Sequence, residues 1–109
     1  MDAEDNKLVV LAKATRARTG AAEGAALRDL DGRTYAAATV DLPSLRIQAL
    51  DVCIAMAVAS AARGAEAAVV LGDAEPSDHA LAPLRDFAGS GVPVHLGTPD
   101  GTVRDTRST

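Results

Sequence analysis

The fold of this 109-residue chain is decided by one stretch of its sequence, Gly24-Ala25-Ala26-Leu27-Arg28-Asp29-Leu30-Asp31-Gly32-Arg33-Thr34-Tyr35-Ala36-Ala37-Ala38-Thr39-Val40-Asp41. Two largely apolar segments, residues 24–30 and 33–40, flank the dipeptide Asp31-Gly32. Asp-Gly supplies the positive φ angles that a tight primed turn requires. The stretch therefore predicts a β-hairpin.

Further strands are predicted where short apolar runs lie between turn residues. The continuous apolar run Ala67–Leu71 is typical of a fully buried strand with a parallel neighbour. Val92–Leu96 predicts another strand, and Pro93 within it indicates an edge of the sheet. Asp100-Gly101 predicts a turn, and we expect the polar residues 104–109 to form a frayed tail.

Two helices are predicted before the apolar strand. In the segment Lys7–Arg18, apolar residues recur at spacings of three and four, as on one face of a helix. Pro43–Ala62 predicts the second and central helix, because proline is well suited to a first helical turn.

A third helix is predicted between the two later strands. Ser77 or Asp78 caps its start, and it ends near Gly89. Pro83 either delays the regular helix to about Ala82 or distorts its first turn. This order of elements predicts one α/β domain over residues 1–109, a three-layer α/β/α sandwich with a mixed sheet.

Composition and charge exclude several classes of protein. The net charge of −4 and the presence of only two aromatic residues argue against general nucleic-acid binding. No apolar run approaches the roughly 20 residues that span a bilayer, and the acidic start is unlike a secretory signal, so we expect a cytoplasmic protein with no membrane contact. A single cysteine, Cys53, excludes an internal disulfide and a multi-cysteine zinc site within one chain.

The segment Val52–Ala62 carries no charge on any side. Eleven residues cover the whole circumference of a helix, so this helix has no fully polar face. One explanation is a second copy of the chain packed against it, which predicts a homodimer or homotetramer. The other is burial between the sheet and the remaining helices of the same chain, and the sequence leaves both open.

The hairpin stretch also resembles the cytidine deaminase family. Gly24-Ala25-Ala26-Leu27, Asp31-Gly32, Tyr35 and Thr39-Val40-Asp41 match a family pattern in which a Val-Gly-Ala-Ala-Leu strand leads through Asp-Gly and Tyr to Asn-Val-Glu. The similarity resumes from Pro76 to Phe87 and ends in a Val-Pro-Val strand. It implies the α/β/α fold, and assembly into dimers or tetramers through the central helices.

The resemblance also implies where the chemistry would lie. Family members bind one zinc ion through a Cys or His in a Cys-Ala-Glu segment and through two Cys of a Pro-Cys-x-x-Cys turn, and the glutamate moves protons to and from the pyrimidine. In this chain the corresponding zinc-ligand and acid positions hold Leu50, Val52, Ser77 and Ala80. The ribose-binding Asn and Glu positions hold Thr39 and Asp41. We therefore expect no catalytic residues, no zinc and no other cofactor.

A rebuilt site is the alternative for these positions. Asp51, Cys53 and His79 lie near the relevant elements, and a Cys/His/Asp zinc site is chemically feasible. The simpler expectation makes Cys53 a buried apolar residue, Asp51 an exposed acid in the first turn of its helix, and His95 a surface residue.

Three functions remain in competition. The first is a catalytically inactive member of the family that acts as an oligomeric scaffold or as a module for an unidentified protein partner. The second is an active hydrolase acting on pyrimidine nucleosides through an atypical site. The third is a nucleoside sensor that uses the remaining cleft.

Overall fold

The Asp31-Gly32 hairpin forms one side of a five-stranded sheet in the computed structural model, which describes residues 1–109. Its strands are β1 (Glu23–Asp29) and β2 (Thr34–Ala38), paired antiparallel as predicted. The turn is not the tight primed turn expected, because Gly32 has φ of +85° but Asp31 has no positive φ, and the Asp29 N–H bonds to the Arg33 carbonyl at 2.8 Å across three residues. The Asp29 carboxylate accepts hydrogen bonds from the backbone N–H groups of Asp31 and Arg33 at 2.9 and 3.0 Å. This side chain therefore holds the turn in shape.

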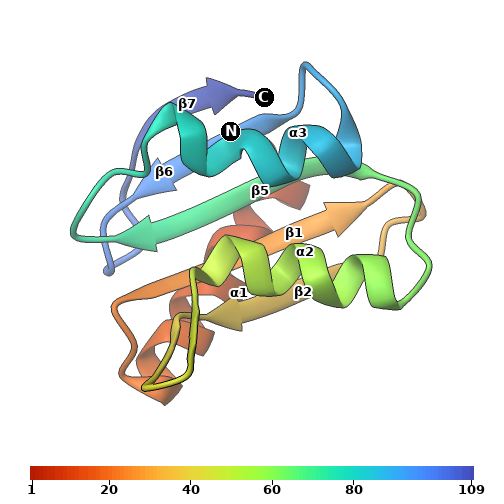
Figure 1. The fold of residues 1–109 in the computed structure, drawn as a ribbon. Coiled ribbons are helices and arrows are strands. Elements are labelled where there is room, and N and C mark those ends of the chain that lie inside the picture. The colour runs from red at the N-terminus through yellow and green to blue at the C-terminus, as the bar shows by residue number, and fades with distance from the viewer.

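The sheet is mixed and has the strand order β2-β1-β5-β6-β7 (Figure 1). Strand β5 pairs antiparallel with β1 and parallel with β6, and β7 pairs antiparallel with β6. The parallel pair lies where a helical crossover was expected, because parallel neighbours need such a connection. The remaining strands of the sheet are β5 (Ala65–Gly72), β6 (Pro93–Gly97) and β7 (Val103–Ser108).

Strand β7 overturns two expectations about the end of the chain. Residues 104–109 are not a frayed tail, since most of them pair with β6, and the Thr109 N–H bonds to the Val92 carbonyl at 3.0 Å. Pro93 is not at an edge, because β6 lies between β5 and β7. Pro93 is the first residue of its strand, another position where a missing N–H is tolerated.

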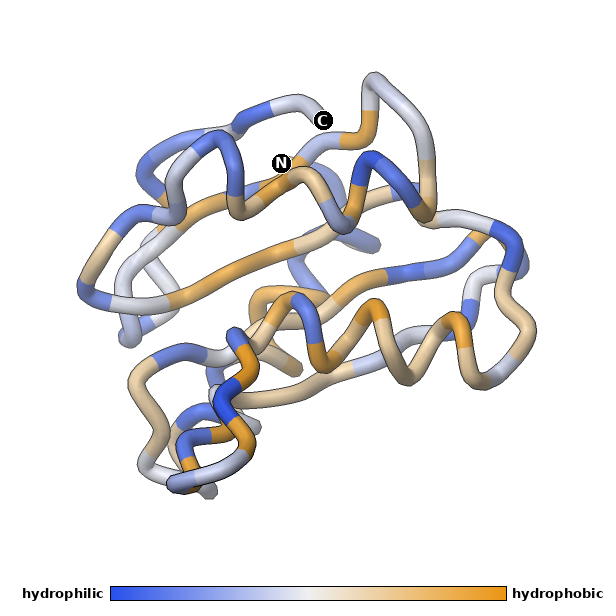
Figure 2. Tube along the Cα trace, in the orientation of Figure 1, coloured by the Kyte–Doolittle hydropathy of each residue, from blue (hydrophilic) through white to orange (hydrophobic).

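Helices cover both faces of the sheet, which confirms the three-layer α/β/α prediction (Figure 1). Helix α1 packs on one face through Leu8 and Ala12, and α2 and α3 pack on the other. Figure 2 shows hydrophobic colours through most of β5, which is buried between these layers. The helices are α1 (Ala3–Thr19), α2 (Ala49–Ala59) and α3 (Ala82–Ala88). None is long and apolar enough to cross a bilayer.

The central helix is shorter than the predicted Pro43–Ala62. A small hairpin precedes it, formed by β3 (Val40–Leu42) and β4 (Leu45–Ile47). Pro43 and Ser44 make the turn of this hairpin, a position that suits the fixed φ of proline as well as a helix start does. The helix leaves Ala55, Val58 and Ala59 exposed, so burial within one chain does not account for its uncharged surface.

The other two helices also differ from prediction at their starts. Helix α1 begins before Lys7, because the Asp2 carboxylate caps it by accepting the Asp5 N–H at 2.8 Å. Ser77 caps a short 3₁₀ turn, η1 (Asp78–Leu81), and α3 follows from Ala82. Of the two alternatives for Pro83, the delayed start of the regular helix is therefore the one observed.

A buried polar network ties α1 to three strands. Asp5, only 7% exposed, accepts a hydrogen bond from Arg28 of β1 at 2.9 Å, and its other oxygen lies 2.8 Å from His95 Nε2 on β6. His95 Nδ1 lies 2.8 Å from Thr106 Oγ1 on β7. The prediction of a surface His95 is therefore wrong, because the carboxylate of α1 and the strand β7 cover it.

Replacing Asp5 by Asn is expected to lower the free energy of unfolding at neutral pH by about 2 kcal/mol, because the partly buried Arg28 loses a charged hydrogen-bond partner and keeps only Glu66. Burial alone would raise the pKa of Asp5, but hydrogen bonds from His95 and Arg28 outweigh it and hold the pKa below its ordinary value of 3.8. The native carboxylate therefore stabilises the fold above pH 3.8, and this contribution is lost as the pH falls further.

Urea unfolding of both proteins between pH 7 and pH 2.5 measures this difference. The matched control is Glu4→Gln, which removes an exposed ion pair with Lys7 and should cost less than about 0.5 kcal/mol. Equal losses for the two variants, or a difference that does not shrink in acid, would contradict the role of Asp5.

Candidate functional site

The four positions at which the resemblance implies zinc ligands and an acid lie at two neighbouring helix starts. Leu50 and Val52 belong to the first turn of α2, and Ser77 and Ala80 belong to the start of η1. Leu50 is 4% exposed, and the space that it lines with Ala80 measures about 10 Å³. That is close to the minimum for a single water molecule. Side chains therefore fill the gap between the two helix starts.

The donor atoms at these positions do not fit zinc. Leucine, valine and alanine offer no nitrogen, sulfur or oxygen, and the Ser77 hydroxyl already accepts the Ala80 N–H at 3.3 Å. Across residues 1–109, no three side chains of His, Cys, Asp or Glu converge on a point that could hold a metal ion. The residues at these positions therefore do not provide the ligands that a metal ion would need to activate a water molecule.

The two implied ribose-binding positions make separate interactions. The Thr39 hydroxyl accepts the Glu23 N–H at 2.9 Å and so fastens the end of β2 to the start of β1. Asp41 lies on β3, is exposed, and has its carboxylate 3.4 Å from Arg46. The hydrogen bond of Thr39 joins two strands, whereas the ion pair of Asp41 with Arg46 is exposed to solvent. The two side chains therefore do not form a common site.

Cys53 lies away from the helix starts. It is fully buried between α2 and β2, where its thiol contacts the Tyr35 carbonyl at 3.5 Å. Burial raises the pKa of Cys53 to about 12, so the thiol stays protonated. A protonated, enclosed thiol is neither a nucleophile nor a metal ligand.

Asp51 and His79 both line a hollow of about 430 Å³ between β4, α2, η1 and α3. Asp51 is partly buried, not an exposed acid as expected, and its Oδ1 is shut off from water with no hydrogen-bond partner. Burial raises the pKa of Asp51. Ala80, one of the implied zinc-ligand positions, lines this hollow as well. The sequence did not point to the other lining residues, which are Arg46, Ile47, Gln48, Ala82, Pro83 and Asp86.

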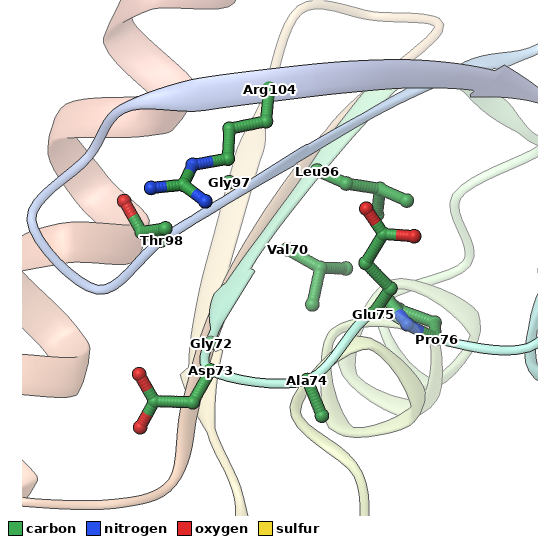
Figure 3. A pocket seen from close by; sticks show the side chains of 10 residues that line it. All are labelled: Val70, Gly72, Asp73, Ala74, Glu75, Pro76, Leu96, Gly97, Thr98 and Arg104. Atoms are coloured by element: carbon green, nitrogen blue, oxygen red, sulfur yellow. The ribbon is translucent and has the colours of Figure 1, made fainter.

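A second hollow lies at the carboxyl ends of the parallel strands β5 and β6, where α/β proteins commonly bind ligands (Figure 3). In the figure, Arg104 extends from β7 beside Thr98, and Glu75 lies across the hollow on the loop after β5. Its volume is about 70 Å³. Pockets for drug-sized ligands measure roughly 300–1,000 Å³, so this hollow is too small for a nucleoside.

Comparison with known families agrees with the geometry of the fold. Residues 1–101 match the family model described as cytidine deaminase-like. The chain belongs to the cytidine deaminase-like family. No curated protein sequence matches it.

Several solved structures share this fold. The cytidine deaminase from Burkholderia pseudomallei is 24% identical, with a TM-score of 0.80, and the match covers 100% of this chain and 92% of that one. The enzyme from Mycobacterium leprae is 21% identical with a TM-score of 0.75, covering 98% and 94%. The enzyme from Bacillus anthracis is 16% identical with a TM-score of 0.70, covering 98% and 84%. At these identities the match establishes the fold.

The rate at which Cys53 reacts with a thiol reagent tests whether this residue is buried and unreactive. At pH 8, a thiol with a pKa of about 12 has roughly 10³-fold less thiolate than an ordinary cysteine. Native protein should therefore react with a disulfide reagent such as DTNB at least that much more slowly than protein unfolded in urea. Fast stoichiometric labelling of the folded chain would place Cys53 in an accessible site and contradict this assignment.

Proposed function

We propose that this chain is a non-catalytic member of the cytidine deaminase-like family and acts as an oligomeric scaffold or partner-binding module. The observation that carries the proposal is the small space, about 10 Å³, that the buried Leu50 lines together with Ala80 where the family resemblance implies a zinc ion. A zinc-activated hydroxide needs three protein ligands and an open position. Neither can form from Leu50, Ser77 and Ala80.

Proton transfer lacks a group as well. The position of the implied glutamate holds Val52, which has no titratable proton. The nearest carboxylate in sequence, Asp51, belongs to a residue that lines the hollow shared with His79. Deamination by the mechanism that the resemblance implies therefore has neither its metal nor its acid.

The exposed side of α2 supports the oligomeric part of the proposal. Ala55, Val58 and Ala59 lie on it, and Val58 is 56% exposed. Small apolar side chains let a second helix approach closely, and a surface without charge has no desolvation penalty for ionic groups. We propose that a second copy of this chain covers that side.

Metal analysis and an activity assay on one preparation test the catalytic part. Protein purified in the presence of zinc should contain no stoichiometric zinc and should produce no ultraviolet change with cytidine. The matched positive control combines Leu50→Cys, Ser77→Cys and Ala80→Cys, which should bind about one zinc ion per chain. Stoichiometric zinc or cytidine turnover in the unaltered chain would refute the proposal.

The same assay distinguishes an atypical active site. Such a site would have to use Asp51 and His79, because these are the candidate residues that share a hollow. Any turnover should then disappear in Asp51→Asn and in His79→Ala. We expect no turnover in the unaltered protein and hence no change on substitution.

Replacing Val58 by Asp tests the assembly. A carboxylate placed in an apolar interface has no partner, so the dissociation constant of the oligomer should rise at least about 10-fold. Light scattering coupled to size exclusion, over a dilution series, measures the mass. The control is Val10→Asp, which alters a similarly exposed valine, 65% exposed, on α1 across the sheet. A strictly monomeric unaltered chain, or equal effects of both substitutions, would contradict this interface.

A further inference from the structure

A buried histidine on β6 lies between a carboxylate and a hydroxyl group. His95 Nε2 is 2.8 Å from Asp5 Oδ2, and His95 Nδ1 is 2.8 Å from Thr106 Oγ1. Both distances are those of well-formed hydrogen bonds. The three side chains are therefore linked in the order carboxylate, imidazole, hydroxyl, which is the order that activates a hydroxyl nucleophile in hydrolases of several unrelated folds.

The two ends of this chain of side chains differ in their access to water. Asp5 and His95 are only 7% and 8% exposed, whereas Thr106 is exposed on the edge strand β7. Helix α1 lies over β1, β2 and β5, so β7 extends beyond the part of this face that the helix covers. A molecule in solution can therefore approach Thr106, while the groups behind it stay enclosed.

The charge of Asp5 fixes the direction of both hydrogen bonds. Although burial opposes it, hydrogen bonds from His95 and Arg28 hold the pKa of Asp5 below 3.8, so near neutral pH its carboxylate only accepts hydrogen bonds. His95 Nε2 must then carry a proton. In the neutral imidazole the lone pair is on Nδ1, and the Thr106 hydroxyl donates to it, as a general base requires.

The pairing of β6 with β7 brings these side chains together. The Thr109 N–H donates to the Val92 carbonyl, and hydrogen-bonded pairs alternate along antiparallel strands, so His95 and Thr106 form a non-hydrogen-bonded pair. Side chains lie closest in such pairs, and the Thr106 N–H is directed to the free edge of the sheet. The exposed Asp105 carboxylate accepts it there at 2.9 Å. This N–H is therefore within reach of a substrate oxygen that displaces the carboxylate.

We propose that Thr106 is the nucleophile of an acyl-transfer site whose substrates are small carboxylic esters with a good leaving group. Thr106 Oγ1 bonds to the ester carbonyl carbon, and its proton passes to His95 Nδ1. The bond from that carbon to the leaving oxygen then breaks, and His95 returns the proton to the departing alcohol. The acyl group stays on Thr106 as an ester. Asp5 is a positioning residue that holds the imidazole in the required tautomer.

This reaction goes beyond the proposed function, because it uses none of the positions at which the resemblance implies zinc ligands. The hydroxyl lies on an open strand, so the reactivity of the ester selects the substrate more than its shape does. Only one backbone donor is near the developing oxyanion, and removing a single such donor typically slows catalysis about 10²- to 10³-fold. We therefore expect the acylated protein to accumulate with little turnover.

Reaction of the native full-length protein with p-nitrophenyl acetate at pH 7.5, followed by peptide mass spectrometry, tests the proposal. The acetyl group should appear on Thr106 at least about 10-fold faster than on Ser108, an exposed hydroxyl two residues along the same strand. In protein unfolded by urea, Thr106 should lose this advantage, because a secondary alcohol is no better a nucleophile than a primary one.

Substitutions then assign the roles. His95→Gln should slow acetylation of Thr106 at least about 100-fold, as expected for loss of a general base. Asp5→Asn should slow it at least about 10-fold, because an amide can donate to Nε2 and reverse the tautomer. Thr106→Ser should keep labelling at position 106. The control Ser108→Ala should leave the rate at Thr106 within about twofold, and the rate at Ser108 in the other variants reports any general loss of structure.

Two results would overturn the proposal. The first is acetylation of Thr106 no faster than that of Ser108 in the native protein, which would make the hydrogen bond to His95 a purely structural one. This result requires no variant and so does not depend on the stability of any substitution. The second is an unchanged ratio of the two rates in His95→Gln. Neither result bears on the zinc content of the protein or on its turnover of cytidine.

Discussion

The carboxylate of Asp5 is the interaction on which the arrangement of this fold depends. It lies beneath α1 and takes hydrogen bonds from Arg28 on β1 and from His95 on β6, and His95 in turn meets Thr106 on β7. One side chain in the first turns of the first helix therefore fixes that helix over three strands, including the last. Apolar contacts such as those of Leu8 hold α1 on the sheet without direction. The hydrogen bonds of Asp5 to β1 and β6, the second of which is extended to β7 by His95, set the position of the helix along the strands.

The sequence predicted those elements whose signal is local. Asp31-Gly32 defined the β1–β2 hairpin, and the run Ala67–Leu71 defined β5, because a strand buried on both faces is apolar throughout. The edge strand β7 escaped prediction because it alternates charged residues with few apolar ones, and an edge strand has one side in water. The burial of His95 also depended on a partner 90 residues away, which no local pattern reveals.

In the candidate site, too, some features follow from the residue types alone and others depend on how distant segments pack. The absence of zinc donors at positions 50, 77 and 80 follows from residue types and can be read without coordinates. The hollow that Asp51, His79 and Asp86 share depends on how α2 and α3 lie against each other. His79 and Asp86 are seven residues apart, which places two residues on the same face of a regular helix. Here Pro83 lies between them and a 3₁₀ turn precedes α3, so the sequence did not define whether they share a face.

A metal site and a packed core place opposite requirements on the space between the starts of α2 and η1. A fold that holds a metal must keep ligands and an open space between them, whereas Leu50 here fills that space and its burial contributes roughly 2 kcal/mol. An apolar side chain at this centre packs without an ion, which is the physical basis of the non-catalytic role that we propose. The exposed side of α2 around Val58 is apolar and uncharged, and we propose that contact with a second copy of the chain is the use that this helix retains.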